Sequence, residues 1–74
     1  MTRYAVVKHR FLSHRQAVKK VQWYAEHQII AQVFRENKIF RVSFGIFYDK
    51  ENAIGRRNLM KEKGYDCSIK TIDE

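Results

Sequence analysis

Hydrophobic residues follow two different spacings along this chain, and together they predict strands that alternate with helices. Residues 4–7, Tyr-Ala-Val-Val, are mostly aromatic or β-branched, which favours a strand. Ala17, Val21, Tyr24 and Ala25 then recur three or four positions apart, so they predict one apolar stripe along a helix. The chain therefore starts with a strand that leads into an amphipathic helix.

Polar residues mark where the helices begin and end. Ser13 precedes Gln16 by three positions, which is the spacing of a capping box at a helix N-terminus. Asp49 is placed to begin a second helix in the same way, and Gly64 to end it, because a left-handed residue usually follows a helix. The sequence thus predicts two helices, one in each half of the chain.

Further apolar runs predict the remaining strands. Residues 29–34 and 65–69 are expected to follow the two helices as strands. Residues 36–38, Glu-Asn-Lys, are expected to form the turn of a hairpin that joins the two halves. Each half therefore reads strand, helix, strand.

An internal repeat supports this division. A shift of 36 positions, without a gap, places apolar residues on apolar residues and one helix cap on the other. The matched pairs are Tyr4 with Phe40, Val6 with Val42, Phe11 with Phe47, Ser13 with Asp49, Ala17 with Ala53, Tyr24 with Met60, Ile29 with Tyr65, Ala31 with Cys67, and Val33 with Ile69. The sequence predicts a duplicated strand–helix–strand unit.

The element order β-α-β-β-α-β predicts one α+β domain over residues 1–74. The expected architecture is a ferredoxin-like sandwich, in which two helices cover one face of a four-stranded antiparallel sheet. Strand alternation assigns these residues to the helix-covered face: Tyr4, Val6, Ala31, Val33, Phe40, Val42, Phe44, Cys67 and Ile69. It assigns these to the open face: Arg3, Ala5, Val7, His9, Ile30, Gln32, Phe34, Arg41, Ser43, Asp66, Ser68 and Lys70.

Charge gives the first indication of a partner. The 74 residues carry 15 Lys and Arg against 8 Asp and Glu, a formal charge of +7, and residues 1–25 contain no acid. Such a basic segment indicates a polyanionic partner, either nucleic acid or an acidic protein surface, although positive charge also serves solubility. The residues expected to contact phosphates are Arg3, Lys8, Arg10, Arg15, Lys19, Lys20, Arg41, Arg56 and Arg57.

A second candidate surface lies on the open sheet face. Val7, His9, Ile30 and Phe34 are expected to form its apolar centre, which suits a protein partner or a second copy in a homodimer. On this interpretation the chain is a regulator or inhibitor, and such a compact basic domain also suits a phage.

Several other classes of function have little support. One cysteine, Cys67, excludes an internal disulfide or a cysteine-based zinc site, and we expect no metal and no cofactor. No apolar run is long enough to span a membrane, so a complete cytoplasmic protein is expected. His9 and His14 are the only pair that suggests catalysis, as general acid and base of a ribonuclease; the more economical interpretation is two solvated loop histidines.

The second half also resembles a known family. Residues 40–47, Phe-Arg-Val-Ser-Phe-Gly-Ile-Phe, are similar to the strand ending in Gly-x-Phe of the SPOR domain, the glycan-strand-binding module of bacterial division proteins. Residues 49–53, Met60 and residues 64–66 continue the resemblance at the family's spacings. It implies a duplicated βαββαβ fold with a ligand site on the open sheet face.

The sequence therefore predicts a small, basic, non-catalytic binding module. Nucleic acid, as RNA or single strands, is the first expected partner. A protein-binding regulator is the alternative, and SPOR-like binding of peptidoglycan glycan is a further one.

Overall fold

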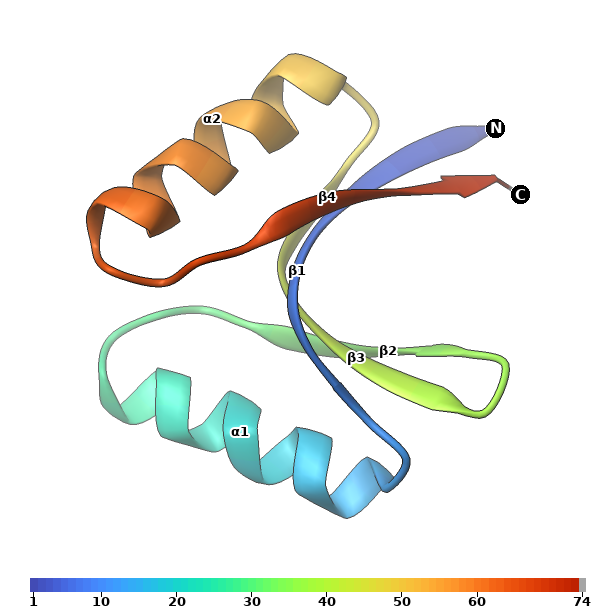
Figure 1. The fold of residues 1–74 in the computed structure, drawn as a ribbon, viewed down its shortest axis with the longest axis vertical. Coiled ribbons are helices and arrows are strands. Elements are labelled where there is room, and N and C mark those ends of the chain that lie inside the picture. The colour runs from blue at the N-terminus through green and yellow to red at the C-terminus, as the bar shows by residue number, and fades with distance from the viewer. Residues whose placement is uncertain (74) are drawn as a thin grey trace.

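The computed structural model describes residues 1–73, which form six elements in the predicted order (Figure 1). The first unit consists of β1 (Thr2–Phe11), α1 (His14–Glu26) and β2 (Gln32–Glu36). The second consists of β3 (Ile39–Phe47), α2 (Lys50–Glu62) and β4 (Ser68–Asp73).

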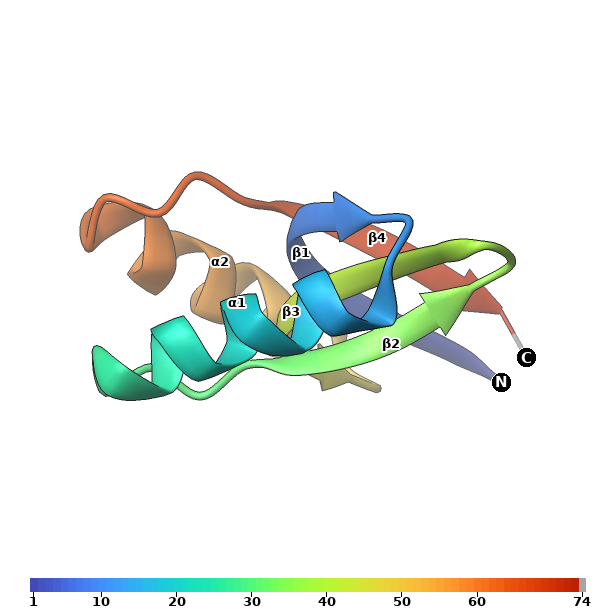
Figure 2. The same cartoon turned by 90° about the horizontal axis from the view of Figure 1, so that it is seen from below.

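The four strands form one antiparallel sheet in the order β2-β3-β1-β4. Figures 1 and 2 place α1 and α2 on the same side of this sheet. α1 packs on β1, β2 and β3, whereas α2 packs on β1, β3 and β4. The predicted ferredoxin-like sandwich is confirmed.

The strand pairing follows the internal duplication. A shift of 36 positions converts the five β2–β3 pairs into five of the six β1–β4 pairs. The pair formed by Val7 and Ser43, between the two central strands, maps onto itself under the same shift. A pseudo-twofold axis therefore passes through the middle of the sheet.

Two bulges interrupt the pairing of the central strands close to this axis. Lys8 has no partner on β3, and Phe44 and Gly45 both lie opposite Val6. Each bulge adds one residue, so each reverses which side of the sheet the following residues face. Beyond their bulges the two central strands therefore no longer follow a simple alternation.

Gly45 is required at the β3 bulge. Its φ is +156°, and a Cβ at this position would lie 2.7 Å from the ring carbons of Phe47. The Phe47 ring therefore packs directly on the glycine backbone, which gives the Gly-x-Phe ending of this strand a steric reason.

The core lies between the sheet and the helices. All nine residues assigned to the helix-covered face are buried in it or packed against it, so that prediction is confirmed. Its largest fully buried side chains from the helices are Tyr24 and Met60, which occupy equivalent positions in α1 and α2.

Both helices end in the same hydrogen-bonded motif. The amide of Ile29 donates to the carbonyl of Tyr24 at 2.9 Å, and the amide of Tyr65 donates to that of Met60 at 2.9 Å. These are the long-range bonds of a Schellman motif, which needs a left-handed residue just before the donor. Gly64 has that conformation in the second half, with φ 93°, and Gln28 has it in the first half, with φ 63°.

These helix ends explain why the strands predicted at residues 29–34 and 65–69 begin too early. The backbone around residues 27–29 and 63–65 is used to close the helices. The strands consequently start at Gln32 and Ser68.

Candidate ligand-binding surface on the concave sheet face

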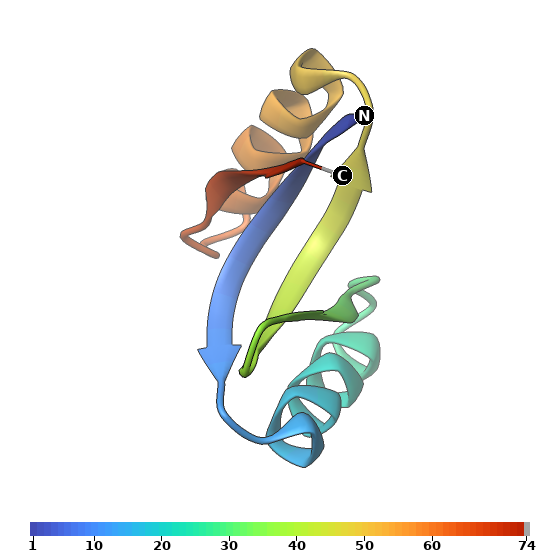
Figure 3. The same cartoon turned by 90° about the vertical axis from the view of Figure 1, so that its right-hand side faces the viewer.

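The uncovered face of the sheet is strongly concave. β1 and β3 bend between their ends, so that the β2–β3 hairpin and β4 come forward together, away from the helices (Figure 1). Figure 3 shows the sheet from this uncovered side. Bulges increase local twist and bending, and both bulges interrupt the two strands that bend, β1 and β3.

Cross-strand partners share a face, so the register defines this surface, which we call the concave face. It is formed by Arg3, Ala5, Val7, Arg10, Gln32, Phe34, Glu36, Ile39, Arg41, Ser43, Ile46, Ser68, Lys70 and Ile72. Ala5, Val7 and Ser43 form its floor and are only 0%, 7% and 0% exposed, although no helix covers them. Longer side chains from the bent strands must therefore fold over this floor.

One carboxylate joins the two sides of the concave face. Glu36, at the end of β2, accepts a hydrogen bond from Arg41 Nε at 3.0 Å through Oε1. Its other oxygen, Oε2, lies 3.2 Å from Lys70 Nζ, which belongs to β4 on the opposite edge of the sheet. The curvature of the sheet makes this ion pair between edge strands possible.

The same contacts set the charge state of Glu36. The hydrogen bond from Arg41, with smaller help from Lys70, lowers the pKa of this carboxyl below its ordinary value of 4.5. Glu36 is therefore ionised at neutral pH and neutralises part of a surface that is otherwise basic.

Ser43 stabilises the floor at the bulge. Its hydroxyl donates to the carbonyl of Gly45 at 2.8 Å and accepts from the amide of Gly45 at 3.0 Å. The side chain thereby satisfies backbone groups that the bulge removes from the strand ladder. Ser43 is the only fully buried polar residue of the described chain.

His9 does not belong to this face, contrary to the sequence-based prediction. The extra residue Lys8 turns His9 toward α1, where its Nε2 lies 2.7 Å from the hydroxyl of Tyr24. Burial, then the positive charges of Lys20 and Lys8, lowers the pKa of His9 below 6.5. Burial also raises the pKa of Tyr24 to about 12, so the pair is a neutral hydrogen bond at neutral pH.

The predicted apolar patch of the open face is only partly present. Val7 and Phe34 do lie on the concave face. Ile30 precedes β2 in the loop after α1 and is 88% exposed, so its assignment to a sheet position is wrong.

The nine predicted phosphate-binding residues do not form one surface. Arg3, Arg10 and Arg41 belong to the concave face, Lys20 lies beside Trp23 on the helix side, and Arg56 and Arg57 belong to α2. Lys8 makes an internal hydrogen bond, since its Nζ donates to the carbonyl of Asp66 at 3.0 Å. The remaining two, Arg15 and Lys19, are exposed on α1.

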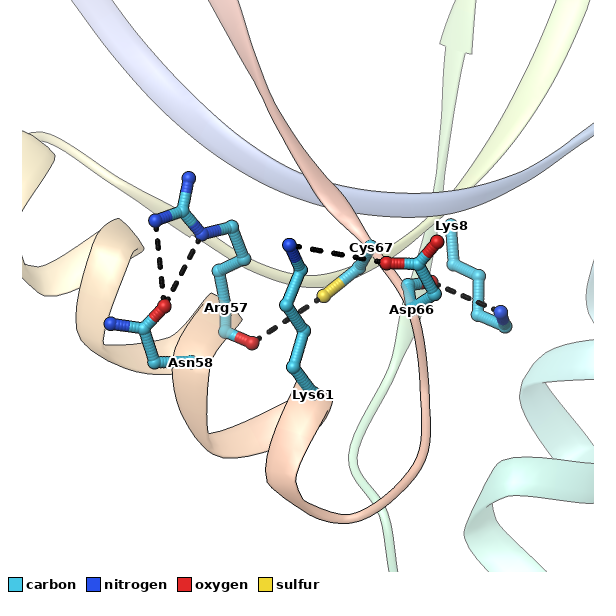
Figure 4. A network of polar contacts seen from close by, with 6 residues as sticks. All are labelled: Lys8, Arg57, Asn58, Lys61, Asp66 and Cys67. Carbon is cyan, nitrogen blue, oxygen red and sulfur yellow. Dashed lines mark hydrogen bonds and ion pairs between the residues drawn. The ribbon is translucent and has the colours of Figure 1, made fainter.

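A polar network fixes the loop between α2 and β4 (Figure 4). Besides the Lys8 contact, Lys61 Nζ lies 3.9 Å from a carboxylate oxygen of Asp66. The buried thiol of Cys67 donates to the carbonyl of Arg57 at 3.7 Å, and burial raises the pKa of this thiol. Cys67 is thus a small core residue that remains protonated.

The two histidines proposed for nuclease chemistry have separate partners. His9 bonds to Tyr24, whereas the ring of His14 packs edge-on against Phe40 with centroids 5.3 Å apart. The structure therefore gives no support to a joint acid–base role. Among residues 1–73, no group of three or more His, Cys, Asp and Glu residues could hold a metal ion.

Sequence reasoning missed Glu36 and Trp23. Glu36 was assigned to a turn, and its contact with Lys70 depends on the curvature of the sheet. Trp23 is the only tryptophan and lies outside the apolar stripe of α1. This position indicates an aromatic side chain that is partly exposed and available for contacts, as the structure shows.

No protein-family model matches the chain, and no curated protein matches it in sequence. Its structure is similar to the solution structure of the peptidoglycan-binding domain of the B. subtilis cell wall lytic enzyme CwlC, with a TM-score of 0.75. The two chains are 19% identical, and the likeness covers 99% of this chain and 92% of the other. No helix within residues 1–73 has the length and apolar character needed to cross a membrane.

This comparison overturns the partner expected from charge. The domain of similar structure is a peptidoglycan-binding domain, not a nucleic-acid-binding one. The nine basic residues also lie on several faces of the molecule, so they do not form the single phosphate-binding surface that was expected. The prediction of nucleic acid as the partner is therefore corrected. The comparison supports the SPOR-like fold and gives no support to an acidic protein partner or a homodimer.

Proposed function

We propose that this domain is a non-catalytic module that binds glycan strands of peptidoglycan on its concave face. The observation that supports the proposal is the likeness to a peptidoglycan-binding domain over nearly the whole chain. Peptidoglycan lies outside the cytoplasmic membrane. The proposal therefore also replaces the expected cytoplasmic location with the cell wall.

The chemistry of the concave face suits a sugar chain. Sugars present hydroxyl and amide groups at their edges and C–H groups on their faces. Phe34 offers an apolar ring to a sugar face. Gln32, beside it on β2, and Ser68, across the floor on β4, are exposed and can donate and accept hydrogen bonds. An extended polymer can lie along the uncovered side of the sheet, across the strands that Figure 3 shows from that side.

The ion pairs of Glu36 can be exchanged for contacts to a ligand on the concave face. Arg41 and Lys70 are held on one carboxylate and are only partly exposed. A ligand oxygen that replaces one oxygen of Glu36 would keep both cations paired. The proposed site therefore exchanges an internal acceptor for a ligand acceptor and leaves no buried charge unpaired.

Co-sedimentation with purified sacculi tests the proposal directly. The wild-type protein should pellet with sacculi whose stem peptides have been removed. Phe34→Ala and Lys70→Gln, each on the concave face, should weaken pelleting by about tenfold. Arg15→Gln, on the exposed side of α1, serves as the control and should pellet like the wild type.

The circular-dichroism spectrum of each variant establishes that it is folded. Failure of the wild-type protein to pellet, or equal pelleting by folded concave-face variants, contradicts the proposal.

A further inference from the structure

A second recess lies on the other side of the sheet, between β1 and α1. It is an open groove of about 500 Å³, which we call the helix-side groove. It is lined by His9, Phe11, Gln16, Lys19, Lys20 and Trp23. Its position follows from the strand pairing: β4 pairs only with residues 2–7 of β1, so the last part of β1 has no neighbour on that edge.

The bulge and the helix period supply the lining residues. Lys8 turns the next alternate residues, His9 and Phe11, toward α1. Gln16, the two lysines and Trp23 are three, four and seven positions apart, so they form one face of the helix.

The groove is basic, and no acid within residues 1–73 neutralises it. Every lining residue belongs to residues 1–25, the segment without Asp or Glu. Among residues 1–73, the ion pairs that the structure contains leave Lys19 and Lys20 without a carboxylate. A groove with two such ammonium groups attracts an oxyanion.

Aromatic rings hold the groove in a defined shape. The rings of His9 and Phe11 are nearly parallel, at 21°, with centroids 5.9 Å apart. Trp23 stacks on His27 with a centroid distance of 3.8 Å, and Lys20 Nζ lies 4.6 Å from the centre of the Trp23 ring. The hydrogen bond between His9 Nε2 and the hydroxyl of Tyr24, at 2.7 Å, holds the histidine ring in place. A cation and apolar surfaces are thus preorganised side by side, as recognition of an acidic sugar requires.

The duplication provides an internal reference for this groove. The residues 36 positions after His9, Lys20 and Trp23 are Gly45, Arg56 and Leu59. A smaller groove of about 330 Å³ does lie there, lined in part by Gly45, Phe47 and Arg56. Phe44 and Phe47 line this second groove, but Trp23 has no aromatic equivalent in it, and Gly55 takes the place of Lys19.

From these features we infer that the helix-side groove binds the carboxylate of an acidic sugar, separately from the concave face. The inference rests on the proposed function in one respect: the muramic acid units of peptidoglycan are sugars that carry a lactyl carboxylate. The carboxylate lies between Lys19 and Lys20, and the sugar ring contacts Phe11 and Trp23. The domain then contacts glycan through two surfaces on opposite sides of its sheet.

Trp23 is the only tryptophan, so its fluorescence reports on the groove. Titration of the wild-type protein with N-acetylmuramic acid should change this fluorescence saturably, and added salt should weaken the response. N-acetylglucosamine, the matched neutral sugar, should have no effect at the same concentrations. An equal response to the neutral sugar overturns the inference, and so does a response to glycerol 1-phosphate with none to N-acetylmuramic acid.

A matched pair of variants locates the binding. Lys20→Gln should weaken the response by about fivefold or more, and Lys20→Arg should restore it. Arg56→Gln, which removes one positive charge at the equivalent position of the other half, should leave it unchanged. Equal effects of the two glutamine variants, or no effect of Lys20→Gln in a protein with wild-type thermal unfolding, overturn the assignment.

Sacculus binding separates this inference from the proposed function. If the wild-type protein pellets with sacculi but its fluorescence ignores N-acetylmuramic acid, the groove assignment alone fails. If it does not pellet but the titration succeeds at Lys20, the concave-face proposal fails and the groove remains an acidic-sugar site.

Discussion

The two halves of this protein share one backbone plan but stabilise it differently. At the position after the bulge the second half has Gly45, covered by the Phe47 ring, whereas the first half has His9, bonded to Tyr24. The equivalent of Tyr24 in α2 is Met60, which is buried without a polar partner of this kind. The second half thus relies on close packing, and the first on a buried polar pair beside a basic groove.

The difference shows how a duplicated unit can divide its tasks. The pseudo-twofold pairing of the strands survives, because both bulges keep their places near the axis. The residues that surround each bulge have diverged into a packed half and a half with polar and charged groups near its surface. Variants at equivalent positions should therefore give different results in the two halves.

The largest effect is expected at Gly45. In Gly45→Ala the new Cβ would meet the Phe47 ring at 2.7 Å, at a φ that L-residues rarely adopt. Overpacking and backbone strain together should lower the free energy of unfolding by about 2–4 kcal/mol, measured by urea denaturation.

Gly55→Ala is the matched control in the same half. A Cβ at Gly55 meets nothing within 4 Å, and the residue lies inside α2. This variant should stabilise the protein by about 0.5–1 kcal/mol, since alanine is the better helix former. If both alanine variants behave alike, close packing on Gly45 does not stabilise the second half.

Ser43→Ala should have the next largest effect. The hydroxyl is fully buried and bonds to both backbone groups of Gly45, at 2.8 and 3.0 Å. Without it these groups lose their partner, which should cost about 1–3 kcal/mol in urea denaturation. A cost near zero would mean that the bulge does not depend on this side chain.

The architecture was predictable because one shift of 36 positions organises the whole chain. All nine core-facing residues follow from alternation, since they lie on or just before β2 and β4, or no further along β1 and β3 than the first bulge residue. His9 was misplaced because alternation fails beyond a bulge. Phe11 and Phe47 indicated the two bulges in the sequence. In each central strand the earlier core residues stand at even positions, whereas these two aromatic core residues stand at odd positions.

The functional surfaces were less predictable than the fold. The ion pair of Glu36 with Lys70 joins strands at opposite edges of the sheet, so it exists only once the sheet is bent. The count of charges along the sequence likewise predicted one continuous basic surface, which the structure does not have. It could not reveal that Arg41 is paired with Glu36 or that Lys8 donates to a backbone carbonyl.

Tyr24→Phe tests the polar pair of the first half. The substitution keeps the buried ring, which packs edge-on against Phe44, but leaves His9 Nε2 without its partner. We expect a loss of about 1–2 kcal/mol in unfolding free energy. Met60→Leu, the conservative change at the equivalent position, should cost under about 1.5 kcal/mol and serves as the control.

The same pair should make stability depend on pH. The folded-state pKa of His9 lies below its ordinary value of 6.5, because burial and nearby lysines disfavour the charged form. Stability is therefore fully present above about pH 6.5 and is lost as the pH falls through the folded-state pKa. Urea denaturation over this range should show a decline that His9→Gln removes; an unchanged decline in that variant would assign it to another group.

The smallest effect is expected where the first half lacks the glycine of the second. Gln28 has φ 63° at the end of α1, the position that Gly64 takes after α2 with φ 93°. A side chain in the left-handed region is strained, so Gln28→Gly should stabilise the protein by about 0.5–1 kcal/mol and raise Tm by roughly 2–6 °C. The reciprocal variant Gly64→Gln should destabilise it by a similar amount. If Gln28→Gly instead lowers Tm, the side chain of Gln28 makes a contribution that outweighs the strain, and the two helix ends are not equivalent.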